Sequence, residues 1–241
     1  MRHLTPIIIL LVVGLLACKG VKEKLTGGSA PSASAGVALA PSSSAPVAGG
    51  EDAVPAPESP QPRPLKVGQF VRYKVTENGD EREFSYSVIG AEGDAHWIQV
   101  ITEKSGRRVV MQLLLAIGDR TDPKSAKLRG LKMKAPGLGV REFRGASLAA
   151  MRKQVDLGMS ELTVPGLTGL KQEDVTVPAG TFKSCYTRDT TTTFLGITAK
   201  QRQWIHTRVP ILALVKSKAL DKNYQIELEE YGETGAKDEL G

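Results

Sequence analysis

Cysteine and histidine, the side chains best suited to nucleophilic and metal chemistry, are rare in this chain. Its 241 residues include two cysteines, Cys18 and Cys185, and three histidines, of which His96 and His206 lie in its body. Neither of these histidines has a carboxylate at metal-ligand spacing, and no Cys-x-x-Cys, His-Glu-x-x-His or calcium-loop pattern is present. A Gly-x-Ser-x-Gly elbow, a Ser-x-x-Lys pair and a phosphate loop are missing as well. The sequence therefore predicts no catalytic residue, no metal site, no cofactor and no enzymatic activity.

Cys18 is the residue whose surroundings indicate a covalent modification. A short basic start precedes an apolar run from Ile7 to Ala17, and Leu15-Leu16-Ala17 stands directly before the cysteine. A basic start, a short apolar core and a small residue at the cleavage point are typical of a secretory signal. The run is also shorter than the ~20 residues of a membrane-spanning helix.

The stretch Leu15-Leu16-Ala17-Cys18 resembles the lipobox of bacterial lipoproteins. The resemblance implies cleavage between Ala17 and Cys18, a diacylglyceryl thioether on Cys18, and an acyl chain such as palmitate on the new amino terminus. Two or three acyl chains anchor a protein firmly, because each buried methylene contributes about 0.8 kcal/mol. Lys19, rather than an aspartate, follows the cysteine and resembles the outer-membrane class, so we expect a lipid-anchored protein of the cell envelope at the outer membrane. The periplasmic face and the cell surface both stay open, as does a soluble exported protein with a coincidental Cys18.

Composition divides the rest of the chain into a linker, a domain and a tail. Residues 18–64 are rich in Ala, Ser, Pro and Gly and have no aromatic residue. Such a segment buries too little apolar surface to offset its ordering entropy, so we expect a disordered linker after the signal peptide at residues 1–17. Residues 65–235 have the composition of one domain with a sizeable core, and residues 236–241 are expected to be a disordered tail.

The domain shows mostly period-two patterning. Val71, Tyr73 and Val75 alternate with polar residues, and Asn78-Gly79 is a strong hairpin signal. About nine such strands are expected, with one helix that is capped by Ser147 and runs through Leu148, Met151, Val155, Met159 and Leu162. The fold class is therefore mainly β (α+β), a curved antiparallel sheet or half-barrel with one packed helix. Cys185 lies in a predicted strand and is expected to be buried.

The last third of the domain carries a family resemblance. Glu173–Phe182 is followed by Gln203-Trp204-Ile205-His206, Val209-Pro210, Ala213-Leu214-Val215-Lys216 and Tyr231-Gly232. This series resembles the lipoprotein-carrier superfamily, the LolA/LolB-like half-barrels, and its uncharacterised relatives. The resemblance implies an antiparallel half-barrel with an apolar concavity that takes acyl chains.

Charge is the uneven feature of the chain. The formal net charge is +6, and residues 120–153 hold ten Lys and Arg against two acids. Basic side chains gain about 1 kcal/mol each near an anionic membrane surface. The candidate contact residues for an anionic membrane surface, an acidic glycan or an acidic envelope protein are Arg120, Lys124, Lys127, Arg129, Lys132, Lys134, Arg141 and Arg144. Scattered, solvated charges are the alternative; nucleic acid is not expected, because the signal exports the chain and no binding motif accompanies the charge.

Together these features predict a non-enzymatic envelope lipoprotein, held at the membrane through lipidated Cys18, whose sheet domain binds a lipid or another apolar ligand. The alternative is a structural or assembly-interaction module of the envelope whose concavity is filled by its own side chains.

Overall fold

The computed structural model describes residues 53–240, apart from residues 105, 138, 150–161, 165, 195 and 196 and the side chains of residues 104, 192–194 and 197–199. The signal peptide, Cys18 and residues 18–52 of the predicted linker lie outside the described residues. So do Met151, Val155 and Met159 of the predicted helix.

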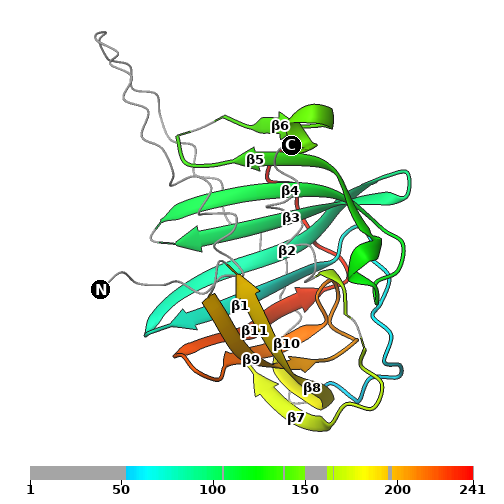
Figure 1. Cartoon of the computed structure of the whole chain (residues 1–241), viewed down its shortest axis with the longest axis vertical. Helices are drawn as coiled ribbons and strands as arrows, with labels where there is room; N and C mark the ends of the chain where they lie inside the picture. Colours follow the sequence, from blue (N-terminus) through cyan, green and yellow to red (C-terminus); the bar gives the residue numbers. More distant parts are fainter. Residues whose placement is uncertain are drawn as a thin grey trace.

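The described chain forms one antiparallel sheet of eleven strands in the order β6-β5-β4-β3-β2-β1-β11-β10-β9-β8-β7 (Figure 1). The strands are β1 Phe70–Glu77, β2 Asp80–Glu92, β3 Ala95–Lys104, β4 Arg107–Ile117, β5 Ala126–Lys134, β6 Arg141–Phe143, β7 Gln172–Val177, β8 Gly180–Phe194, β9 Ile197–Ile205, β10 Leu214–Ala219 and β11 Tyr224–Gly232. A 3-10 turn, η1 Pro123–Ser125, precedes β5. The mainly β, curved and unclosed antiparallel sheet is confirmed, with eleven strands in place of about nine; one of the additional strands, β6, is too short to show a period-two pattern.

The β1–β2 hairpin shows how local sequence sets the register of the sheet. Asn78 and Gly79 both have positive φ, 53° and 93°, as the twist of a two-residue hairpin turn requires. The turn fixes Glu77 opposite Asp80, and it thereby places Tyr73 opposite Phe84. These two rings stack with centroids 4.9 Å apart, so the turn aligns aromatic partners on one face.

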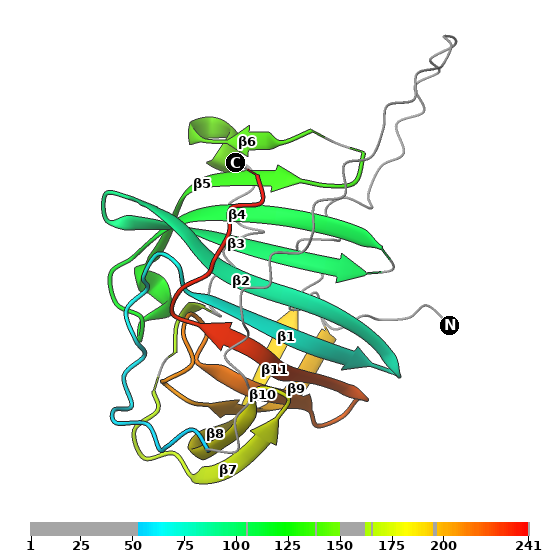
Figure 2. The same ribbon diagram turned by 180° about the vertical axis from the view of Figure 1, so that it is seen from behind.

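Both halves of the sheet contribute to one core. Val71 and Tyr73 of β1 belong to the same buried cluster as Phe182 of β8 and Ile211 of the β9–β10 loop. The Tyr73 hydroxyl donates a 2.9 Å hydrogen bond to the carbonyl of Leu214, at the start of β10. The sheet must curl for these residues to meet, and both views show its halves set at an angle (Figures 1 and 2). We call the apolar side the inner face and the opposite side the outer face.

The helix begins earlier than the sequence predicts. Residues 145–149 are helical, so Ser147 lies inside the first turn and is not the cap. Its hydroxyl instead donates to the carbonyl of Arg144, at 2.8 Å. Leu148 and Leu162, on either side of the undescribed residues 150–161, are both buried in the inner-face core, as predicted. Within the described ranges, no helix is long and apolar enough to cross a bilayer.

Residues 53–64 belong to the domain, although their composition assigns them to the disordered linker. Val54 forms a parallel bridge with Phe182, and its N–H donates to the carbonyl of Thr181 at 2.7 Å. The Thr207 hydroxyl donates to the carbonyl of Ser59 at 2.7 Å, and Arg208 pairs with Glu58. The domain boundary therefore moves from residue 65 to residue 53.

His206 anchors this segment from within the core. Its side chain is fully buried and lies edge-on to Phe182. Nδ1 accepts the N–H of Arg208 at 3.3 Å, so Nε2 carries the proton and donates to the carbonyl of Pro55 at 3.1 Å. Burial lowers the pKa of His206 from 6.5 to about 4, and this keeps the ring neutral.

The neutral ring predicts a loss of stability in acid. The folded state resists protonation of His206, so its contribution is complete above about pH 6.5 and is lost as the pH falls toward about 4. The full difference is on the order of 3 kcal/mol in the free energy of unfolding. We expect His206→Gln, which keeps an N–H donor and does not titrate, to be less stable than the wild type at about pH 7 and to lose less on acidification. Urea unfolding at about pH 7 and about pH 4 measures the free energies of unfolding of the wild type and of the variant. If the difference between the two proteins is the same at both pH values, His206 is not the neutral, buried group assigned here.

Candidate functional site

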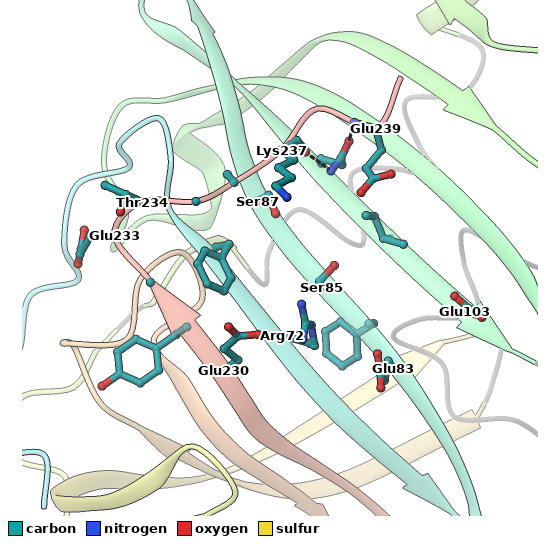
Figure 3. A pocket seen from close by; sticks show the side chains of 18 of the residues that line it. Arg72, Glu83, Ser85, Ser87, Glu103, Glu230, Glu233, Thr234, Lys237 and Glu239 are labelled. Atoms are coloured by element: carbon teal, nitrogen blue, oxygen red, sulfur yellow. Dashed lines mark hydrogen bonds and ion pairs between the residues drawn. The ribbon is translucent and has the colours of Figure 1, made fainter. Parts of the chain in front are cut away.

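A polar groove of about 660 Å³ lies on the outer face, over β1, β2, β3 and β11 (Figure 3). Period-two alternation places its floor residues opposite the inner-face core residues of the same strands. One wall is formed by residues 233–240, which leave β11 and run back across β2, β3 and β4 (Figure 2). We call residues 233–240 the strap.

Two buried glutamines hold the strap. Gln99 of β3 and Gln112 of β4 face each other in register, and each is 1% exposed. Gln99 Nε2 donates to the carbonyl of Lys237 at 2.9 Å, and its Oε1 accepts the N–H of Glu239 at 2.9 Å. Gln112 Nε2 donates to Asp238 Oδ1 at 2.6 Å and to Gln99 Oε1 at 3.2 Å. Residues 236–240 thus have a defined course, in place of the disordered tail that their composition predicts.

The turn into the strap depends on two glycines around Phe70. A Cβ on Gly232 would lie 2.5 Å from Phe70 Cε1, closer than real contacts allow. Gly235 has φ +111°, a conformation that other residues rarely adopt, and it also lies against the Phe70 ring. The Ala236 N–H then donates to the carbonyl of Gly68 at 2.9 Å. Only glycine at these positions lets the chain fold over the ring and back onto the sheet.

Glu233, at the start of the strap, is held by polar contacts. Gln69, 1% exposed, donates to Glu233 Oε2 at 2.8 Å, and Arg63 forms a 2.7 Å ion pair with Oε1. Partial burial raises the pKa of Glu233, but the hydrogen bonds from Gln69 and Arg63 outweigh it and lower the pKa below its usual value. The carboxylate therefore stays ionised and ties the strap to the segment that leads into β1.

The groove lining is rich in charge and hydroxyl groups. Ion pairs join Arg72 to Glu230 at 2.8 Å and Arg108 to Glu239 at 3.1 Å. The remaining polar residues of the lining, several of them labelled in Figure 3, are Glu83, Ser85, Ser87, Gln99, Glu103, Glu233, Thr234 and Lys237. Glu83 and Glu103 are both exposed. A groove of this kind suits an extended polar ligand that offers hydrogen-bond donors and acceptors along its length.

In the described part of the chain, no group of three or more His, Cys, Asp or Glu side chains is placed to hold a metal ion. His96 is half-buried in β3, and His206 is engaged by backbone groups. Cys185 is free and fully buried, as predicted, and burial raises the pKa of its thiol to about 12. The thiol is therefore protonated and inert at neutral pH.

Seven of the eight predicted anion-contact residues lie at one edge of the sheet. Lys124 is in η1, Lys127, Arg129, Lys132 and Lys134 are in β5, Arg141 is in β6, and Arg144 directly follows β6. Two of them are already ion-paired, Arg129 with Asp94 at 2.7 Å and Arg144 with Glu142 at 2.6 Å. Lys132 lies over the ring of Trp97, with Nζ 4.7 Å from the centroid. The edge is basic, but neighbouring groups already satisfy part of its charge.

Arg120 does not belong to this edge. Its guanidinium donates to the carbonyls of Arg63, Leu162 and Ile211, and burial lowers its pKa to about 10. These three carbonyls come from three separate segments, so Arg120 joins them and is not free to contact an external anion. The sequence predicts Arg120 as an anion contact like the other seven residues, and this is wrong because composition does not show that the fold already engages its guanidinium.

Loss of Arg120 should destabilise the fold. We expect Arg120→Ala to lower the free energy of unfolding by about 2–4 kcal/mol, because three carbonyls lose a charged donor. Lys127→Ala, at an exposed position of the neighbouring strand, is the control and should change stability by less than about 0.5 kcal/mol. Urea unfolding of both variants tests this; equal effects would show that Arg120 does not join the three segments.

The sequence contains a signal for the strap site in the two glutamines. Gln112 is the only polar residue between Val109 and Ile117, and Gln99 lies between Ile98 and Val100. An amide in such a strand must find a hydrogen-bond partner when it is buried. The sequence of the strand does not predict which group that partner is. For Gln112 it is Asp238, 126 residues further along the chain.

Comparison with known proteins gives no family for the chain. No protein-family model and no curated protein matches it. Among solved structures it is similar to a DUF1329 family protein from Desulfovibrio piger, with 11% identity and a TM-score of 0.24, over 68% of this chain and 82% of that one. A likeness this weak assigns neither a family nor a function.

Proposed function

We propose that this protein is a lipid-anchored, non-enzymatic component of the bacterial cell envelope whose sheet domain docks an extended polar segment of an envelope partner on its outer face. The observation that carries the docking role is the outer-face groove of about 660 Å³, one wall of which is the strap held by two buried glutamines. The lipobox at Leu15–Cys18 supports the anchoring.

The packing of the inner face favours docking over lipid carriage. Tyr73, Phe84 and Tyr86 contact one another in the core, and each is less than 9% exposed. Leu212 from the β9–β10 loop and Leu148 from the helix add to the same cluster. Apolar side chains that already contact one another gain little from an acyl chain, because their surface is out of water.

An apolar ligand on the inner face is the leading prediction from the sequence and is kept here as the second candidate function; native mass spectrometry tests it. The full mature chain, extracted from membranes in mild detergent, should be recovered with the mass of the lipidated protein alone. Recovery with an additional bound lipid, or uptake of a labelled fatty acid by the purified protein, would favour the carrier and count against a self-filled core.

Cys18→Ala tests the anchor. Without the thiol no diacylglyceryl thioether forms, so we expect the variant to keep its signal peptide, to lack acyl chains and to leave the membrane fraction after detergent-free washing. Mass spectrometry of the protein and membrane fractionation measure both effects. Cys185→Ala is the matched control and should be processed and anchored like the wild type; an anchored Cys18→Ala variant would rule out the lipoprotein assignment.

The basic edge formed by η1, β5 and β6 remains a candidate contact for an anionic membrane surface, an acidic glycan or an acidic protein. Such a contact would gain from the exposed lysines Lys124, Lys127 and Lys134. Single exposed charges contribute little, so this edge would orient the anchored domain rather than supply its specificity.

Site-specific crosslinking in cells tests the docking role of the groove. A photo-crosslinking amino acid at Ser85, on the groove floor, should capture one reproducible envelope protein. The control is the same amino acid at Lys222, an exposed residue in the β10–β11 turn, which should capture none. Equal capture at both positions, or none at Ser85, would contradict the proposal.

A further inference from the structure

The strap resembles a bound peptide more closely than it does a packed part of the fold. Gln99 contacts two main-chain groups that lie two residues apart, the carbonyl of Lys237 and the N–H of Glu239. These are the groups that an adjoining β-strand would engage in an extended segment. The amide of Gln99 therefore makes the hydrogen bonds that the backbone of a neighbouring strand would make, and it can do so with any extended chain that crosses β3.

Side-chain contacts add a preference for acidic residues. Gln112 Nε2 donates to the carboxylate of Asp238 at 2.6 Å, and Arg108 forms a 3.1 Å ion pair with Glu239. A carboxylate hydrogen bond of this kind is charge-assisted and stronger than one between neutral groups. The site thus recognises a main-chain segment that carries two successive acidic side chains and bends at the second, where the Leu240 N–H also donates to Asp238 Oδ1 at 2.8 Å.

Burial makes this an organised site. Gln99 and Gln112 are each 1% exposed, on strands whose neighbouring residues are apolar. Buried amides in such surroundings need their hydrogen bonds satisfied, and the strap supplies them. With the strap displaced, the two amides would require water or another extended chain.

The contacts that hold residues 236–240 are exchangeable. They are hydrogen bonds and one ion pair whose side chains, Arg108 and Glu239, are 48% and 37% exposed. Hydrogen bonds that replace water contribute modestly, and exposed ion pairs contribute little. The turn at Gly232 and Gly235 connects the strap to β11, so its main advantage over a free peptide is its high local concentration.

We propose that the Gln99–Gln112–Arg108 site binds an extended segment of the envelope partner that carries two successive acidic residues, and that the strap occupies this site in cis and competes with it. This inference rests on the docking function proposed above, and it names both the class of partner and the element that regulates access. A partner segment displaces residues 236–240 and continues into the groove beside them.

Peptide binding in vitro tests the competition. The probe is a fluorescein-labelled peptide with the sequence of residues 233–240, and the readout is fluorescence anisotropy with the full mature chain and with a chain that ends after Gly235. We expect the shortened chain to bind the peptide at least about 10-fold more tightly than the full chain, because the cis competitor is gone. A peptide with alanine in place of its aspartate and second glutamate should bind at least about 10-fold more weakly.

A second set of variants keeps the test independent of truncation. In the full chain, Asp238→Ala with Glu239→Ala should weaken the strap and increase binding of the unmodified peptide. Lys237→Ala is the matched control, because the contact of Lys237 with Gln99 uses only its carbonyl; binding should stay as in the full chain. In the shortened chain, Gln99→Leu with Gln112→Leu should abolish binding.

Three results would overturn the inference. The first is no peptide binding by a shortened chain with the circular dichroism spectrum of the full chain. The second is equal binding by the full and shortened chains. The third is association of the shortened chain with an intact copy in place of the peptide, which would make a second copy the occupant. If a partner is still captured at Ser85 when one of these three results is found, the docking function stands, but the partner segment is not of the acidic class proposed here.

Discussion

The apolar faces of the two halves of the sheet meet in one core, and the burial of that surface determines where every other feature lies. Val71 and Tyr73 on β1 and Phe182 on β8 belong to opposite halves, yet they share one cluster. Hydrophobic burial is non-directional and grows with the apolar area removed from water, so a broad sheet with one apolar face gains most by curling around it. The outer face carries the polar groove over its middle strands and a smaller apolar cluster of Ala95, Leu114 and Ala116 beside Trp97.

Polar side chains hold distant segments of the chain against the apolar core. His206 and Arg120 each donate to backbone carbonyls of segments distant in sequence. In both, burial shifts the pKa, which is the expected cost of placing an ionisable group where water is scarce. These contacts explain how a segment with the composition of a linker, residues 53–64, becomes part of the domain.

On the outer face, buried polar side chains again bind a segment distant in sequence, the strap, but through weaker contacts. Gln99 and Gln112 are as buried as core residues, but they are covered by a strap held through hydrogen bonds and a partly exposed ion pair. The difference in strength between the two faces suggests a division of roles. The inner face holds the fold together, whereas the outer face offers an extended polar surface whose cover is exchangeable.

Local sequence was informative wherever neighbouring residues set the structure. The Asn78-Gly79 turn, the alternation of β1 and the burial of Cys185 were all predictable, because turn geometry and period-two burial act over a few residues. The short β6 and the start of the helix before Ser147 were not, since a three-residue strand and a helix end depend on their tertiary neighbours.

The sequence by itself determined the mainly β antiparallel class, the hairpin register and the absence of recognisable catalytic motifs, and it predicts the lipid anchor at Cys18. Only the tertiary structure decided that residues 53–64 and 236–240 lie on the domain, that Arg120 is an internal anchor, and that Gln99 and Gln112 form a site. The reason is physical. Composition and periodicity report whether a residue prefers water, but the partner that satisfies a buried polar group is chosen by contacts between segments more than a hundred residues apart.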